Sequence, residues 1–317
     1  MKKILLAAMA VIAFTSCSQD EEMDNATQNS RIRLGAIVNT TTKAVVTDNS
    51  NFTAFTVVGY ATDGEMAAGT ALGTPFIPAT PITKSGDTWT TKTLDYYWPF
   101  NKQVQFFATS PTQTLTVPDT GYPTFNYTIN TTSDTQEDLL VAKVANQTAT
   151  TAGDNGVILG FTHALTQVNF SVKGGDGNTY KVSSIKIAGI NDAGKYDFAT
   201  GQWTPAASTA SYDYPLAENA AVTGTDAVAI GAANGALMLM PQTFSTGSKV
   251  TVTYQVFAGE TPISDTITAD ADLNGSTAWT PSAKFRYTIT LANGGKNIVL
   301  GTPTVTGWSS SETEINK

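Results

Sequence analysis

The sequence consists largely of short runs in which apolar and polar residues alternate, and glycine or proline interrupts these runs repeatedly. From Arg31 onward, for example, alternate residues share one face of an extended chain: Ile32, Leu34, Ala36 and Val38. No later run sustains the period of an amphipathic helix. Threonine, a β-branched residue that suits strands, occurs 53 times in 317 residues. The pattern therefore predicts an all-β protein.

Chain length and loop composition suggest two domains. Similar runs recur from residues 52–60 to residues 285–291, at spacings typical of β-sandwiches. Residues 147–156 contain mainly Thr, Ala, Gly, Asp and Asn, which is typical of a loop near a boundary. We therefore expect an N-terminal β-sandwich domain over residues 31–156 and a C-terminal one over residues 157–317. Glycine-rich stretches at 174–178 and 293–295 predict hairpin turns.

The N-terminus has the features of a secretory signal. Lys2 and Lys3 precede an apolar run from Ile4 to Phe14, which is too short to span a membrane, since a spanning helix needs about 20 residues. The only cysteine, Cys17, follows directly, so the segment resembles a bacterial lipoprotein signal in which residues 1–16 are removed and Cys17 is lipidated. The alternative is a signal peptide that contains a cysteine by chance. Residues 17–30 are polar and acidic, and we expect a flexible tether.

Charge and composition argue against several classes of function. The formal net charge is -8 and the pI is near 4.6, which disfavours nucleic acid as a partner. One Cys and one His exclude a zinc ribbon, a disulfide framework and a Cys–His metal cluster. There is no Gly-x-Ser-x-Gly nucleophile motif. We expect a protein without cofactor, metal site or catalytic residues, and so not an enzyme.

Two motifs suggest chemistry but are incomplete. His163 stands alone between apolar residues, and an isolated histidine of this kind is more often a hydrogen-bonded structural residue than a catalyst. Residues 270–275 imitate the start of a calcium loop with Asp270, Asp272 and Asn274. Its twelfth position is Pro281 instead of the required bidentate Glu, so we expect a turn.

Acidic and aromatic residues leave two alternatives open. Asp134, Glu137 and Asp138 form an acidic cluster that a secreted hydrolase would require in a cleft, but a solvated loop is the simpler interpretation. Exposed aromatic residues on a surface lipoprotein that does not polymerise would bind glycans. The tryptophans are dispersed, however, which favours core packing: Trp89, Trp98, Trp203, Trp279 and Trp308.

The ordered set of motifs resembles the fimbrillin family of the Bacteroidetes. The motifs that carry the resemblance run along the whole chain: Ser16-Cys17, residues 32–38 followed by 42–44, 52–60, 97–99 before 104–108, 136–142, 161–165, 240–242, and 287–291 before Gly307-Trp308. The resemblance implies two transthyretin-like β-sandwich domains in tandem and export as an outer-membrane lipoprotein. It also implies cleavage by a trypsin-like protease and assembly with other subunits into a cell-surface fimbrium that functions in adhesion.

The resemblance also assigns roles to residues near the N-terminus. Ile32, Leu34, Ala36 and Val38 become the face of a first strand that is removed, so that a strand from another subunit takes its place. The family's cut falls between the positions of Lys43 and Ala44. The well-known family protease is Arg-specific, and cleavage at Arg31 or Arg33 instead would leave most of the strand in place. The C-terminal residues 298–305 alternate poorly, so shaft, tip and accessory subunits all remain open.

Overall fold

The computed structural model describes residues 31–38, 50–86, 88–91, 96–218, 220–233, 235–292 and 298–308. Within these residues the regular structure is almost entirely strand, which confirms the predicted all-β class. Two short helical turns interrupt it, η1 (Ser133–Thr135) and α2 (Ala149–Ala152). No helix in the described ranges is long and apolar enough to cross a membrane.

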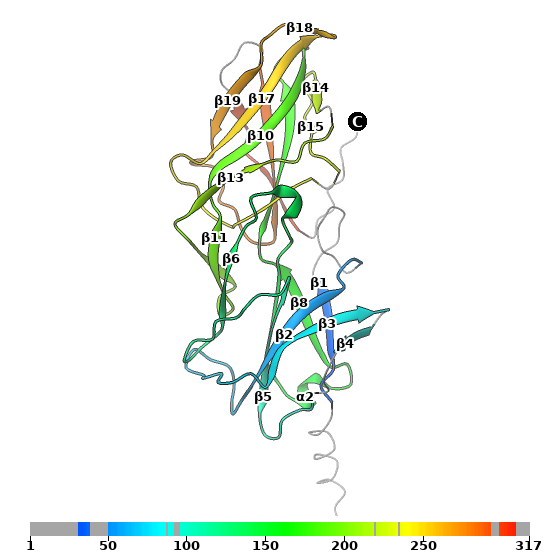
Figure 1. Ribbon diagram of the computed structural model, residues 1–317, viewed down its shortest axis with the longest axis vertical. Coiled ribbons are helices and arrows are strands. Elements are labelled where there is room, and N and C mark those ends of the chain that lie inside the picture. The colour runs from blue at the N-terminus through cyan, green and yellow to red at the C-terminus, as the bar shows by residue number, and fades with distance from the viewer. Residues whose placement is uncertain are drawn as a thin grey trace, which may run out of the picture.

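The first half of the chain forms a seven-stranded sheet, in the lower part of Figure 1, with the order β1-β8-β7-β5-β2-β3-β4. Neighbouring strands are antiparallel except for β1 and β8, which run parallel with Leu34 opposite Val157 and Val38 opposite Phe161. The strands are β1 (Leu34–Val38), β2 (Ala54–Thr62), β3 (Ile77–Ser85), β4 (Thr88–Thr91), β5 (Gln103–Ser110), β7 (Leu140–Gln147) and β8 (Val157–His163).

The second half forms two further sheets that share one core, which gives a sandwich-like arrangement (Figure 1). The first contains β10 (Thr179–Asn191), β13 (Thr209–Asp213), β14 (Ala221–Thr223), β17 (Lys249–Ala258), β18 (Thr261–Pro262) and β19 (Ile267–Asp272). The second contains β9 (Thr166–Gly174), β15 (Val228–Ala229), β16 (Leu237–Leu239), β20 (Ala283–Leu291), β21 (Val299–Leu300) and β22 (Thr304–Gly307).

A three-stranded sheet joins the two halves. It has the order β12 (Gln202–Pro205), β11 (Ala193–Asp197), β6 (Thr124–Thr128), so a strand from the first half pairs with one from the second. Residues next to this small sheet pack on one face of the seven-stranded sheet. There the ring of Phe198, which directly follows β11, lies 5.2 Å from the ring of Phe107 in β5. Strands β2 and β5 are consequently buried on both faces.

The first sheet extends beyond the predicted boundary between residues 156 and 157. Strand β8 starts at Val157, where the predicted second domain begins, yet it pairs with β1 and β7 of the first sheet. Residues 147–156, which precede it, connect β7 to β8, two strands of the same sheet. We propose that a division into two domains falls after His163.

One predicted hairpin is wrong. Strand β9 ends at Gly174 and β10 begins at Thr179, but these strands lie in different sheets, so the turn between them connects the two layers of the sandwich. The other predicted hairpin turn, at 293–295, lies outside the described residues.

Candidate functional site: the position of the first strand

Strand β1 and the residue two positions before it pack on the core of the seven-stranded sheet. Ile32 is 7% exposed and Val38 is 1% exposed, while Leu34 and Ala36 are half-buried against the same core. The residues between them point outward, and Ile37 is 48% exposed. We call the position occupied by residues 32–38 the first-strand site.

The floor of the first-strand site is aromatic and aliphatic. Strand β8 contributes Val157, Leu159 and Phe161, all buried. The ring of Phe161 lies 4.8 Å from that of Phe52 and 5.1 Å from that of Phe55. Removal of β1 would therefore expose an apolar surface to water.

Backbone hydrogen bonds hold residues 31–38 on both edges, on β8 and on residues 96–97, where Arg31 and Tyr97 form an isolated antiparallel bridge. The N–H of Val157 donates to the carbonyl of Arg33 at 2.9 Å, and the N–H of Ile32 donates to the carbonyl of Tyr96 at 2.7 Å. Among the described residues, β1 is the terminal strand of its sheet and has only β8 as a partner strand. Without β1, the edge of β8 would present unpaired N–H and C=O groups, which is the surface that β-strand addition uses.

Gly156 permits the close approach of β1 to β8. Its φ is +72°, a conformation that favours glycine, and a Cβ at this position would lie 2.5 Å from the Arg33 carbonyl oxygen. The loop that the sequence suggests as a domain boundary thus has a local role, since it ends at the glycine beside the first strand.

The burial of β1 has a moderate energetic value. Ile32 and Val38 are buried, and full burial stabilises such side chains by roughly 1.5–3 kcal/mol each, so the two together contribute at most roughly 3–6 kcal/mol. This gross value is small enough for a competing strand with similar inward residues to match it. The burial free energy of the first strand is therefore large enough to hold it in place and small enough for another strand to displace it.

The structure cannot place three of the predicted site residues, because Cys17, Lys43 and Ala44 lie outside the described residues. His163, the last residue of β8, is 2% exposed, and its Nδ1 lies 2.8 Å from the Asp138 carboxylate. Asp138 is thus buried beside an imidazole, which the expectation of a solvated acidic loop did not foresee. The other two members of that cluster, Asp134 and Glu137, are exposed.

The residues of the calcium-like segment have other partners. Asp270 lies in β19, where its carboxylate accepts hydrogen bonds from Lys249 and Thr251, both at 2.6 Å. These bonds, with Lys249 the larger contribution, lower the pKa of Asp270. The predicted turn follows the strand, at Asn274 and Gly275. No group of metal-ligating side chains occurs within the described part of the chain.

The tryptophans are packed inside the molecule. Trp98, Trp279 and Trp308 are buried, whereas Trp89 and Trp203 are half-buried. The indole N–H of Trp203 donates to the carbonyl of Ala164 at 2.7 Å. These positions match the core-packing interpretation and give no support to a tryptophan platform for glycans.

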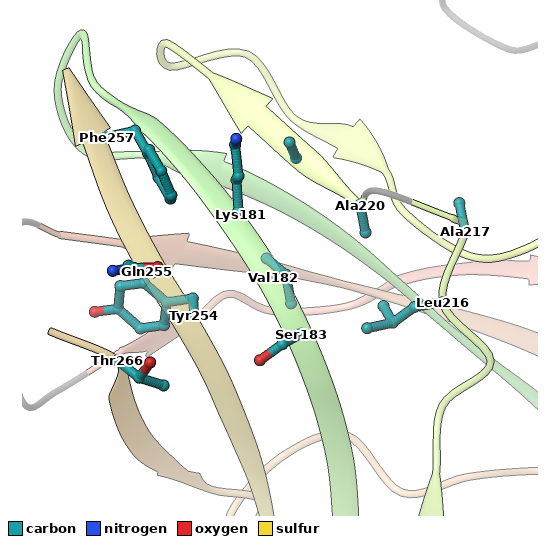
Figure 2. Close-up of a pocket in the computed structure, with 11 residues that line it drawn as sticks. Lys181, Val182, Ser183, Leu216, Ala217, Ala220, Tyr254, Gln255, Phe257 and Thr266 are labelled. Carbon is teal, nitrogen blue, oxygen red and sulfur yellow. The ribbon is translucent and has the colours of Figure 1, made fainter. Parts of the chain in front are cut away.

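A cavity of about 600 Å³ lies at the far end of the second half, between β10, β17 and the residues Leu216, Ala217, Ala220 and Ala221 (Figure 2). The ammonium group of Lys181 sits 4.2 Å above the ring of Phe257, and the hydroxyl of Tyr254 donates to the carbonyl of Ala292 at 3.1 Å. The described residues that line the cavity include no carboxylate and no imidazole.

Sequence reasoning missed a contact region at residues 163–165. Three consecutive carbonyls accept hydrogen bonds from the second half: His163 from Ser282 Oγ, Ala164 from Trp203 Nε1 and Leu165 from Ser282 N–H. The run 161–165 stood out in the sequence, but only the folded chain shows that it connects the two halves.

Comparison with known proteins agrees with this architecture. Solved structures with similar folds include a fimbrial protein from Bacteroides vulgatus, which is 19% identical, with a TM-score of 0.67 over 88% of this chain and 100% of that chain. A putative cell adhesion protein from Bacteroides uniformis is also 19% identical, with a TM-score of 0.56 over 88% of this chain and 98% of that one. A putative cell adhesion protein from Bacteroides ovatus is 17% identical, with a TM-score of 0.52 over 90% and 99%.

A search of the curated proteins finds none that matches this chain. The model of the fimbrillin-like family, in contrast, matches residues 40–308, which is most of the sequence. This span includes the apolar floor of the first-strand site and the 161–165 run. The chain therefore belongs to the fimbrillin-like family.

Proposed function

We propose that this protein is a non-enzymatic structural subunit of a cell-surface fimbrium that functions in adhesion, and that it assembles with other subunits by donor-strand exchange. Membership of the fimbrillin-like family supports the fimbrial role. The observation that carries the mechanism is the position of β1, an edge strand with a buried apolar face and a single partner strand among the described residues.

The exchange follows from the chemistry of the first-strand site. Once β1 leaves, β8 presents an open hydrogen-bonding edge next to the buried residues Leu159 and Phe161. A strand from another subunit that carries apolar residues at alternate positions restores both the hydrogen bonds and the burial. The donor thus needs the same period of two that places Ile32 and Val38 inward.

We also propose that export and attachment precede assembly. Residues 1–16 act as the signal, Cys17 carries the lipid and residues 17–30 form the tether to the outer membrane before processing. Processing then separates the lipid anchor from the folded chain, since Cys17 and β1 leave in the same fragment.

The proposed cut between Lys43 and Ala44 fits the arrangement of the strands. It falls after the last residue of β1, Val38, and before the first residue of β2, Ala54. Cleavage there separates the whole strand from the rest of the chain. Cleavage after Arg33 would leave all of β1 attached.

Replacing Lys43 by glutamine is expected to abolish productive processing. The test uses the chain with Cys17→Ser, so that no lipid complicates the assay, and treats it briefly with trypsin. We expect the parent to yield a product that begins at Ala44, identified by mass spectrometry, and to form SDS-resistant oligomers. The Lys43→Gln chain should yield neither.

The matched control is Arg33→Gln, an exposed position directly before β1. This variant should be processed and should assemble like the parent. A product that begins at Leu34, or oligomers from the Lys43→Gln chain equal to those of the parent, would contradict the proposed cut.

A further inference from the structure

His163 and Trp308 form a buried contact between the two halves of the molecule. The imidazole of His163, at the end of β8, and the indole of Trp308, which directly follows β22, have ring centroids 4.3 Å apart and planes inclined by 11°. Both residues are 2% exposed. The end of the C-terminal strand is thus stacked on the strand that borders the first-strand site.

Backbone and side-chain hydrogen bonds reinforce this stack. The N–H of Trp308 donates to the carbonyl of Ser282 at 3.0 Å, and the hydroxyl of Ser282 donates to the carbonyl of His163 at 2.7 Å. On its other side, His163 Nδ1 is 2.8 Å from the Asp138 carboxylate. Ser282 therefore bonds to both stacked residues, and a shift of either one disturbs the other.

Strand β8 has two neighbours that meet it at different places. Residues 157–161 pair with β1, and the inward residues Leu159 and Phe161 lie beside Ala36 and Val38 on the same face of the sheet. His163 lies two residues further along and is also buried, so it continues the same face of the strand. A change at β1 therefore reaches the His163–Trp308 stack through the same short strand.

The stack carries an energetic cost. His163 Nε2 and Trp308 Nε1 are buried and have no hydrogen-bond partner among the described residues. An unpaired buried polar atom disfavours the closed arrangement, because water would satisfy it once the segment opens. The contact thus depends on neighbours that hold the two rings together.

We propose that the His163–Trp308 stack couples the C-terminal strand to the first-strand site, so that loss of β1 increases the opening of residues 299–308. The inference rests on the proposed fimbrial function for its biological meaning. In that setting the precursor keeps both β1 and β22 in place, and only the processed subunit presents a readily opened β22. His163 and Trp308 are positioning residues: their stack holds the end of β22 against β8, and β8 pairs with β1.

Hydrogen–deuterium exchange of the full-length monomer with Cys17→Ser tests this coupling in both directions. Val38→Asp should displace β1 and speed exchange of residues 299–308 by about tenfold, whereas the exposed neighbour Ile37→Asp should not. Conversely, Trp308→Ala should speed exchange of residues 34–38 and 157–163 by about the same factor. Val305→Ala, an exposed position on β22, is the matched control.

Two further results decide the outcome. Trp308→Phe, which keeps an aromatic ring over His163, should restore slow exchange in β1, and the core amides of residues 250–256 should stay protected in every variant. The proposal is overturned if Val38→Asp frees β1 while residues 299–308 exchange as in the parent, or if residues 250–256 accelerate equally. These measurements use the monomer, so they are independent of assembly. The coupling can be absent although cleaved chains assemble, and it can be present although cleaved chains do not assemble.

Discussion

Replacing Val38 by aspartate is expected to empty the first-strand site without any cleavage. Val38 is 1% exposed among apolar side chains, so a carboxylate placed there would lose its hydration. The cost of several kcal/mol is comparable to the at most roughly 3–6 kcal/mol that the buried side chains of Ile32 and Val38 contribute together. The strand should therefore leave, and the site should accept another strand.

A labelled peptide with the wild-type sequence of residues 31–38 measures this effect. We expect saturable binding to the Val38→Asp chain by fluorescence anisotropy and no binding to the parent, whose own strand competes at an effective concentration of about 1 mM. Ile37→Asp, which changes an exposed residue of the same strand, should behave like the parent. Absence of binding to the Val38→Asp chain would count against an exchangeable strand.

Replacing Phe161 by alanine is expected to lower the free energy of unfolding by about 3–5 kcal/mol, because it opens a cavity in the hydrophobic core of the seven-stranded sheet. Phe161 is fully buried and contacts the rings of Phe52 and Phe55. Urea unfolding followed by circular dichroism gives the measurement. The midpoint urea concentration should fall, while the slope of the unfolding free energy against urea concentration stays unchanged.

The neighbouring residue supplies the control. Ile158 is exposed on the other face of β8, so Ile158→Ala should change the unfolding free energy by less than about 0.5 kcal/mol. A loss below about 1 kcal/mol for Phe161→Ala would show that the floor of the first-strand site is less tightly packed than the structure indicates.

The alternation of residues 32–38 was enough to predict a strand with one apolar face, because the period of two is a local property of extended chains. Its partner was not predictable. Leu34 pairs with Val157, a contact between distant parts of the sequence that depends on the path of every intervening strand. Gly156 illustrates the same limit, since its need for a positive φ next to Arg33 becomes visible only when β1 and β8 are side by side.

Loop composition was a weaker guide than strand pattern. Residues 147–156 have the composition of a linker but connect two strands of one sheet, and the glycines at 174–178 connect two sheets instead of forming a hairpin. Both cases involve turns, where glycine and asparagine satisfy local geometry whatever the turn connects. His163 was correctly expected to be a hydrogen-bonded structural residue, but its stacking on Trp308 depends on tertiary contacts.

Exchange of the first strand is the central claim, and a reversible covalent lock tests it most directly. Gly35 and Ile158 are paired across β1 and β8, and a Cβ on Gly35 would lie 2.7 Å from Ile158 Cδ1. Gly35→Cys with Ile158→Cys, in the Cys17→Ser chain, therefore places two thiols within reach of a disulfide on the outward face. Oxidation should hold β1 in place even after cleavage at Lys43.

The measurement is the size distribution of the trypsin-treated double variant, by SDS gel electrophoresis and size-exclusion chromatography, before and after reduction. The account predicts monomers while the disulfide is intact, and SDS-resistant oligomers that accumulate once dithiothreitol breaks it. Oligomers of equal amount and size in the oxidised and reduced samples would contradict it, because assembly would then proceed with the first strand still in its site.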